Sequence, residues 1–117
     1  LLFLPEGEYH ELGLLFLNYL MKNKGVGTIY AGTNIPFKDV AYIIDLKKPD
    51  FIFCHLTTTV SNFSIEKFLD KSSHYFQGTP LIVSGHPIMH YKKTIPSGIS
   101  FKYSLVEMMD FINQLGA

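Results

Sequence analysis

Residues 1–20 read LLFLPEGEYHELGLLFLNYL, and this stretch predicts a strand, a loop and a helix in that order. Leu1–Leu4 is a short apolar run that ends at Pro5, which is typical of a buried strand. Polar, turn-forming residues follow at 5–9. Apolar side chains then recur three and four residues apart, which gives a helix one apolar face that we expect to point inward. The residues of that face are Leu12, Leu15, Phe16, Tyr19 and Leu20.

The same alternation of apolar runs and helical patterns continues along the chain. Four more strands are expected, at Val26–Ala31, Phe51–Leu56, Leu81–Ser84 and Ile99–Phe101. Three more helices are expected, from the capping residues Asn34 and Pro36 to Lys47, from about Ser61 to Tyr75, and after a capping box at Ser104 and Glu107. Their inward faces are predicted to be Phe37, Val40, Ala41 and Ile44, then Ile65, Phe68 and Leu69, and last Leu105, Met108, Met109 and Ile112.

The expected strands are continuous apolar runs that do not alternate apolar with polar residues. That pattern is typical of a parallel sheet covered by helices on both faces, with right-handed crossovers. The sequence therefore predicts an α/β fold of the flavodoxin-like (Rossmann-like) kind, a doubly wound five-stranded parallel sheet of strand order 2-1-3-4-5, in one domain spanning residues 1–117. Ligands of such sheets bind beside the switch point at the carboxyl ends of the strands, which selects segments 5–13, 54–59 and 84–90.

The composition excludes several classes of function. Ten basic and ten acidic residues give no net charge, so a basic surface for direct nucleic-acid binding is not expected. The chain contains no Arg, which excludes phosphate clamps built on guanidinium groups. Its one cysteine, Cys54, excludes an internal disulfide and indicates a reducing, cytoplasmic location. No apolar run approaches the roughly 18 residues of a membrane span, so no membrane contact is expected.

The loop after the first strand carries the most informative chemistry. Glu8 lies two residues before His10, so in an extended loop both side chains point the same way. A neutral imidazole offers one nitrogen to a metal, and a carboxylate commonly holds its other N–H. Gly13 lacks a Cβ and lets a bulky ligand approach the start of the helix. The alternative is that His10 is only solvated and that Glu8 and Glu11 merely complement the helix dipole.

Two further segments come to the same edge of the predicted sheet. Strand three ends in Cys54-His55-Leu56 and is followed by three threonines, and strand four ends in Ser84-Gly85-His86. Small residues at these ends leave a slot between strands one, three and four. Taken singly, each segment is ordinary loop chemistry, because a Gly after a strand usually marks a turn.

Together the three segments resemble the motifs of base-off, His-on cobalamin-binding domains. Glu8-x-His10-x-x-Gly13 resembles their D/E-x-H-x-x-G, Cys54-x-Leu56 resembles their S-x-L, and Ser84-Gly85 resembles their G-G. The order and approximate spacing match across the whole chain. Residues 8–15 (EYHELGLL) and 29–36 (IYAGTNIP) are most similar to the cobalamin domain of MerR-type transcriptional regulators of the light-sensing CarH/LitR type.

The resemblance implies a role for each of these residues. His10 would be the lower axial ligand of cobalt, replacing the dimethylbenzimidazole of the cofactor, and Glu8 would orient His10. The cofactor would be adenosylcobalamin or methylcobalamin. Its displaced nucleotide tail would enter a slot whose residues are Gly13, Cys54, Leu56, Thr58, Ser84 and Gly85.

The resemblance also implies an architecture. Residues 1–117 would be the cobalamin-binding sensory domain of a longer regulator and would not be an enzyme. DNA would be contacted only through a separate winged-helix domain, and a helical bundle would cover the upper face of the corrin. The fold allows a homo-oligomer. A domain cut from a longer protein also agrees with a chain that opens inside an apolar run.

Two residues depart from the family pattern. Cys54 stands where the family has a Ser whose hydroxyl bonds the tail base, and a thiol is a weak substitute for that donor. Ser84 replaces the first Gly of G-G and adds bulk to the slot. Such changes either weaken cofactor binding or mark a relative that has lost the cofactor.

Other functions therefore remain open. A corrinoid carrier domain of a methyltransferase or mutase shares the same motif, and a cofactor-free interaction domain shares the same fold. A phosphorelay receiver is disfavoured because its third strand ends in Asp, whereas here the strand ends in Cys54-His55. His86 and His90 lie four residues apart and could hold a metal on a helix, but Pro87 lies between them and no further ligand is evident.

Overall fold

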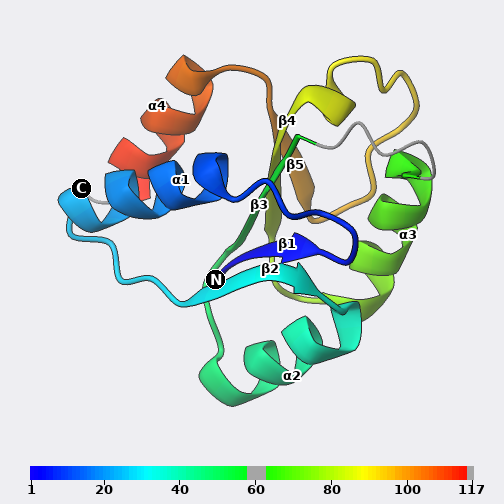
Figure 1. The fold of residues 1–117 in the computed structure, drawn as a ribbon, viewed down its shortest axis with the longest axis horizontal. Coiled ribbons are helices and arrows are strands. Elements are labelled where there is room, and N and C mark those ends of the chain that lie inside the picture. The colour runs from blue at the N-terminus through cyan, green and yellow to red at the C-terminus, as the bar shows by residue number, and fades with distance from the viewer. Residues whose placement is uncertain (58–62, 116–117) are drawn as a thin grey trace.

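One sheet of parallel strands forms the centre of the molecule (Figure 1). The computed structural model of the chain describes residues 1–57 and 63–115. Within these residues the strands are β1 (Leu2–Pro5), β2 (Tyr30–Ile35), β3 (Ile52–Leu56), β4 (Leu81–Gly85) and β5 (Ile99–Lys102). Their order is β2-β1-β3-β4-β5, and every neighbouring pair is parallel. The predicted fold class and strand order are confirmed.

Helices cover both faces of this sheet. They are α1 (Leu12–Asn23), α2 (Phe37–Lys47), α3 (Ile65–Tyr75) and α4 (Leu105–Leu115), with a short 3₁₀ turn, η1 (His86–Ile88), after β4. Helix α1 packs beside α4 on one face, and α2 packs beside α3 on the other (Figure 1). The sheet is therefore doubly wound, and the loops that follow its strands lie at the carboxyl edge. Among the described residues, none of the helices has the length and apolar character needed to cross a membrane.

Aromatic side chains fix the sheet from both sides. All four residues of β1 are buried. Phe3 packs against Phe37 and Phe76, with ring centroids 6.4 and 5.7 Å apart, and Phe53 packs edge-on against Phe111 of α4 at 5.9 Å. Each such pair adds about 0.5–1.5 kcal/mol beyond the burial of apolar area. The ends of the central strands, from which the candidate site is built, are therefore rigidly placed.

The second strand begins later than the sequence predicted. The prediction was Val26–Ala31, whereas β2 pairs with β1 from Leu2 opposite Tyr30 to Pro5 opposite Ile35. Asn34 consequently lies inside β2 and does not cap the next helix. Its side-chain oxygen accepts a hydrogen bond from the Gly7 N–H at 3.0 Å. The start of β2 is therefore set by its pairing with β1, and the local sequence pattern contains no information on that pairing.

The buried face of α1 also differs from the predicted one. Leu14, Leu17 and Met21 point into the core, while Leu12 is 82% exposed and Tyr19 is 62% exposed. Apolar residues surround most of this helix, so two stripes have helical spacing. The connection from β1 to α1 determines which stripe faces the sheet, and the other stripe is exposed to solvent.

The other helices follow the sequence more closely. Phe68 and Leu69 of α3 and Val40 of α2 are buried as predicted. Met108 and Ile112 of α4 are buried as well. Other predicted inward residues were wrong or only partly right: Leu105 and Met109 are exposed, and Phe37, Ala41, Ile44 and Ile65 are half-buried.

The capping box predicted before α4 is present in part, because Ser104 caps the helix but Glu107 reaches back to Tyr103 and not to Ser104. The Ser104 hydroxyl accepts the Glu107 N–H at 3.2 Å, and the Glu107 carboxylate accepts the Tyr103 N–H at 3.2 Å.

Candidate functional site

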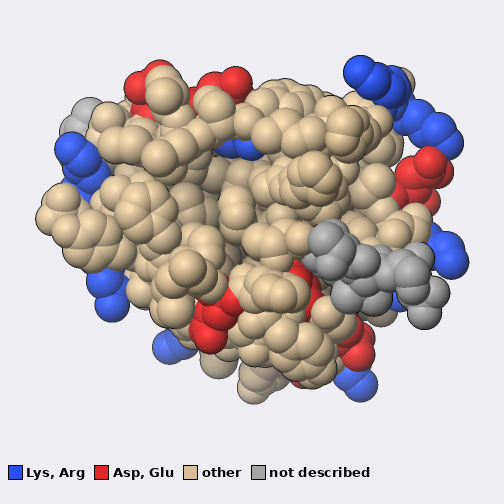
Figure 2. Space-filling view, turned by 45° about the horizontal axis from the view of Figure 1, so that its top comes forward, with Lys and Arg blue, Asp and Glu red and all other residues tan. Residues whose placement is uncertain are grey.

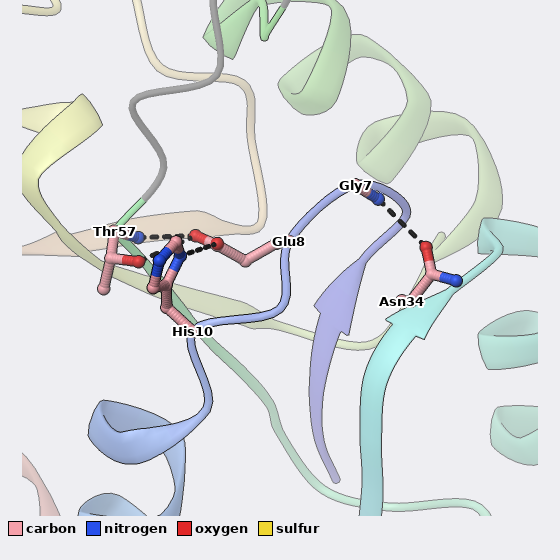
Figure 3. Close-up of polar contacts among 5 residues, drawn as sticks. All are labelled: Gly7, Glu8, His10, Asn34 and Thr57. Atoms are coloured by element: carbon pink, nitrogen blue, oxygen red, sulfur yellow. Dashed lines mark hydrogen bonds and ion pairs between the residues drawn. The ribbon is translucent and has the colours of Figure 1, made fainter.

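The three segments selected by the topology meet at the carboxyl edge of the sheet. The loop between β1 and α1 lies beside the end of β3, and β4 lies next to β3 with His55 opposite Ser84 and Leu56 opposite Gly85. Figure 3 shows the loop turning over this edge so that Glu8 reaches Thr57, the residue after β3. A site is thus assembled from parts of the chain about fifty residues apart.

Glu8 is the fixed point of the site. Glu8 is only 1% exposed. Its Oε1 accepts the Thr57 N–H at 2.6 Å and the Thr57 hydroxyl at 3.2 Å. Burial by itself raises the pKa of this carboxyl, but the hydrogen bonds from Thr57 and His10 outweigh burial and leave the pKa of Glu8 below its ordinary value. Glu8 is therefore an ionised carboxylate at neutral pH, tied to the end of β3.

His10 is held by that carboxylate and faces solvent. Its Nδ1 lies 3.2 Å from Oε2 of Glu8, and its side chain is 71% exposed (Figure 3). An ionised carboxylate only accepts hydrogen bonds, so Nδ1 must carry the proton. In the neutral ring the lone pair is then on Nε2. A histidine oriented in this way by a carboxylate is the arrangement used for metal ligation.

The backbone of the loop is fixed at Gly7 and Glu8. Gly7 has a φ of +88°, and its N–H donates to the Asn34 side chain on β2. The Glu8 N–H donates to the Pro5 carbonyl at 3.0 Å, and the Asn34 N–H donates to the Glu8 carbonyl at 3.3 Å. The Glu8–His10 pair therefore stands on a loop that is bonded to β1, β2 and the end of β3.

A cavity of about 550 Å³ opens beside this loop, between α1, α4 and the ends of β3 and β4. Phe16, Leu17 and Met108 give it apolar walls, and Thr57, which holds Glu8, lies on its rim. Lys102 also lines it, and no Asp or Glu does so among the described residues. The volume lies within the range of small-molecule sites. Figure 2 shows a face that is hollowed and almost uncharged in the middle, with most charged side chains at its edge.

His55 occupies the side of this cavity next to α1. Its Nδ1 lies 2.8 Å from the Ser84 hydroxyl, and its ring lies against Gly13. A Cβ on Gly13 would overlap His55 Cδ2 and would lie 2.8 Å from Nε2. Burial lowers the pKa of His55, although the Glu8 carboxylate acts in the opposite direction. The ring is therefore neutral at pH 7.

Gly13, Ser84 and Gly85, three of the residues assigned to the tail slot from the sequence, line this cavity. Gly85 has a φ of +110°, and a Cβ there would overlap the Leu56 carbonyl, so only glycine fits this close approach of β4 to β3. Thr58, also assigned to the slot, lies outside the described residues.

Cys54 and Leu56 are not at the cavity, and their assignment to it needs correction. Both are fully buried, and neither belongs to the cavity wall. Side chains alternate along a strand, so the residues of β3 on the cavity side are Phe53, His55 and then Thr57. The prediction was therefore shifted by one residue. Burial, with a smaller contribution from Glu8, raises the pKa of the Cys54 thiol well above its ordinary value, which makes the thiol inert.

His55 is the site residue that sequence reasoning missed. The two-residue period of a strand places His55 on the same side as Phe53, but that side is identified only by the contact of Phe53 with Phe111, which the local sequence does not contain. The other histidine pair does not form a metal site. The rings of His86 and His90 have centroids 5.7 Å apart, but no cluster of three potential His, Cys, Asp or Glu ligands exists in residues 1–57 and 63–115.

By sequence, neither a protein-family model nor a curated protein matches this chain. By structure, it is similar to the methanol:cobalamin methyltransferase complex MtaBC from Methanosarcina barkeri (TM-score 0.74, 14% identity) and to the monomethylamine corrinoid protein of the same organism (0.72, 13%). It is also similar to a cobalamin-binding protein from Desulfitobacterium hafniense DCB-2 (0.71, 16%). These matches cover 97–99% of this chain but only 45–57% of the other chains, so the chain spans about half of their length.

A fourth similar structure is a mutant of the anti-anti-sigma factor PhyR from Bartonella quintana, with a TM-score of 0.56 and 13% identity. This match covers 97% of the present chain and 48% of the PhyR chain. At these identities the likenesses establish the fold, which three cobalamin or corrinoid proteins share with this chain, and function has to be argued from the site.

Proposed function

We propose that this domain binds a corrinoid at the carboxyl edge of its sheet, with His10 as the lower axial ligand of cobalt. The observation that carries the proposal is the Glu8–His10 pair. A buried, ionised carboxylate holds Nδ1 of an exposed imidazole at 3.2 Å and leaves Nε2 as the lone-pair nitrogen. The names of three structural neighbours, which are cobalamin or corrinoid proteins, support the same cofactor class.

The residues present fit this group. His10 would ligate the metal, Glu8 would orient His10 through the loop bonded to Thr57, and the cavity of about 550 Å³ between α1, α4 and the sheet would lie next to the bound corrin. The bound corrin would supply the cobalt–carbon chemistry, and the chain would supply ligation and orientation. The domain by itself would act as a binding module and not as an enzyme.

The role favoured among corrinoid-binding modules is that of a carrier domain that presents the corrinoid to a methyltransferase. Two of the structural neighbours are named as a methyltransferase complex and a corrinoid protein. A second candidate is the sensory domain of a MerR-type regulator in the cytoplasm, which the sequence of residues 8–15 favours. The coding sequence adjoining this domain separates the two, since the regulator requires a DNA-binding winged helix and the carrier does not.

The ligation is tested by loading the purified chain with hydroxocobalamin, desalting it and recording the visible spectrum. Electron paramagnetic resonance of the reduced cob(II)alamin form then identifies the axial atom. Uniform ¹⁵N labelling of the protein should convert the nitrogen splitting from triplets to doublets, because the ligand nitrogen would come from the protein. His10→Ala should abolish this change. The matched control is His74→Ala, since His74 is also an exposed histidine but lies on α3. Triplets that persist after labelling would exclude ligation by His10.

A further inference from the structure

The space beside Gly13 is filled by a side chain of the protein itself. The His55 ring lies against Gly13, so the opening that this glycine leaves at the start of α1 is taken up by the imidazole. The ring is also tethered, because its Nδ1 is hydrogen-bonded to Ser84 at 2.8 Å. His55 and Ser84 face each other directly across the β3–β4 ladder. The two residues therefore form one unit that narrows the cavity between α1 and the sheet.

The remainder of the cavity has a different character. Phe16, Leu17 and Met108 give it apolar walls, and Lys102 is its one lysine or acidic residue among the described positions. An uncharged or anionic group is accepted in such surroundings. The restriction is therefore steric and local to His55, and the electrostatics of the cavity do not oppose a tail.

We propose that His55, tethered by Ser84, determines which corrinoid tails the cavity admits and selects against a full nucleotide tail. The inference rests on the proposed function. A planar base can lie between Gly13 and the sheet only when the imidazole leaves, and its departure breaks the bond to Ser84. A hydrogen bond of this kind contributes about a factor of two to ten to an equilibrium. A corrinoid without a tail leaves the His55 ring in place and does not meet this cost.

The test compares two probes, hydroxocobalamin, which carries the full tail, and aquocobinamide, which has none. Dissociation constants are measured by visible titration for the wild type, His55→Ser and Ser84→Ala. The quantity of interest is the ratio of the cobalamin constant to the cobinamide constant. Displacing the cofactor's own base from cobalt weakens the binding of cobalamin equally in every variant. This contribution therefore cancels when the ratios of different variants are compared.

His55→Ser should lower this ratio twofold to tenfold, because the dissociation constant of cobalamin should fall while that of cobinamide stays the same. Ser84→Ala, which keeps the ring but removes its tether, should lower the ratio in the same direction and by less. The matched control is His74→Ser, because His74 is an exposed histidine on α3 that does not line the cavity, and its ratio should equal that of the wild type. In the wild type, the NMR signals of the His55 ring should shift with cobalamin and stay in place with cobinamide.

An unchanged ratio in both His55→Ser and Ser84→Ala would overturn the proposal. A higher ratio in His55→Ser would overturn it as well, since the imidazole would then be a favourable contact for the tail. Failure of the wild type and the variants to bind either probe would reject the corrinoid function itself, and this inference with it. Binding of cobinamide with an insensitive ratio rejects only the role of His55.

Discussion

At the scale of single residues, the site depends on a carboxylate that is both buried and charged. Glu8→Gln keeps the size of the side chain but removes its charge and its firm hold on Nδ1 of His10. We expect corrinoid affinity to fall about 10- to 100-fold, as for other residues that orient a metal ligand. Loss of the charged hydrogen bonds to Thr57 should also lower the free energy of unfolding by about 1.5–3 kcal/mol. Titration and urea unfolding measure the two effects.

The control for that change is Glu6→Gln, because Glu6 is exposed in the same loop. It should alter neither quantity. Equal affinity of Glu8→Gln and the wild type would mean that the His10 orientation is set by the backbone alone.

Gly13 and His55 should be energetically coupled. Gly13→Ala places a methyl group into the His55 ring, and such overpacking costs about 1–3 kcal/mol. In the His55→Ser background the same change should be neutral or stabilising, because alanine favours a helix over glycine. A double-mutant cycle from urea unfolding measures the coupling, which should exceed about 1 kcal/mol. Gly27→Ala serves as the control, since a Cβ on Gly27 meets nothing within 4 Å. Additive single changes would mean that the ring does not rest on Gly13.

The pH dependence of stability should also report His55. Burial lowers its pKa in the folded protein below the ordinary value of 6.5, despite the opposing Glu8 carboxylate. The unfolded chain then takes up a proton before the folded protein does, so the free energy of unfolding falls as pH drops below 6.5 and stops falling below the lowered pKa. Urea unfolding at about pH 7.5 and about pH 5.5 should show a smaller loss in His55→Gln than in the wild type or His74→Gln. An equal loss in all three proteins would assign the effect to other groups.

At the scale of elements, α1 shows where sequence patterns stop being sufficient. Its apolar residues have helical spacing on two stripes, and the sequence does not contain the crossover geometry that selects one of them. Leu17→Ala should therefore lower the free energy of unfolding by about 2–5 kcal/mol, because Leu17 is buried. Leu12→Ala should change it by less than about 0.5 kcal/mol, because Leu12 is on the surface. Similar losses for both variants in a urea titration would contradict the orientation of the helix.

The same reasoning separates what the sequence could predict from what it could not. Strand order, the doubly wound arrangement and the Glu8–His10 pair all follow from short-range spacing together with general rules of topology. The slot residues of β3 required the strand register, and a slip of one residue moved the assignment from His55 to Cys54. The start of β2 likewise depends on pairing with β1. Long-range pairing, which a local pattern lacks, explains both corrections.

At the scale of the whole molecule, the same sheet is shared with cobalamin proteins and with an anti-anti-sigma factor, so the fold alone does not decide between a cofactor module and a cofactor-free interaction domain. The two functions differ in one measurable property. The folded cofactor module binds a corrinoid that the unfolded chain does not bind, whereas the interaction domain binds none. Only the cofactor module couples a corrinoid to the stability of the whole domain.

That coupling can be measured directly. A ligand at about 100 times its dissociation constant stabilises the native state by about 2.7 kcal/mol. For a domain of this size such a gain raises Tm by roughly ten degrees. We expect hydroxocobalamin to produce this shift in the wild type, and His10→Ala to keep the ligand-free Tm but lose most of the shift. Because His10 is exposed, its replacement should not disturb the core. A wild-type Tm unmoved by either hydroxocobalamin or aquocobinamide would identify the chain as a cofactor-free relative, in which the Glu8–His10 pair only fastens the loop to the end of β3.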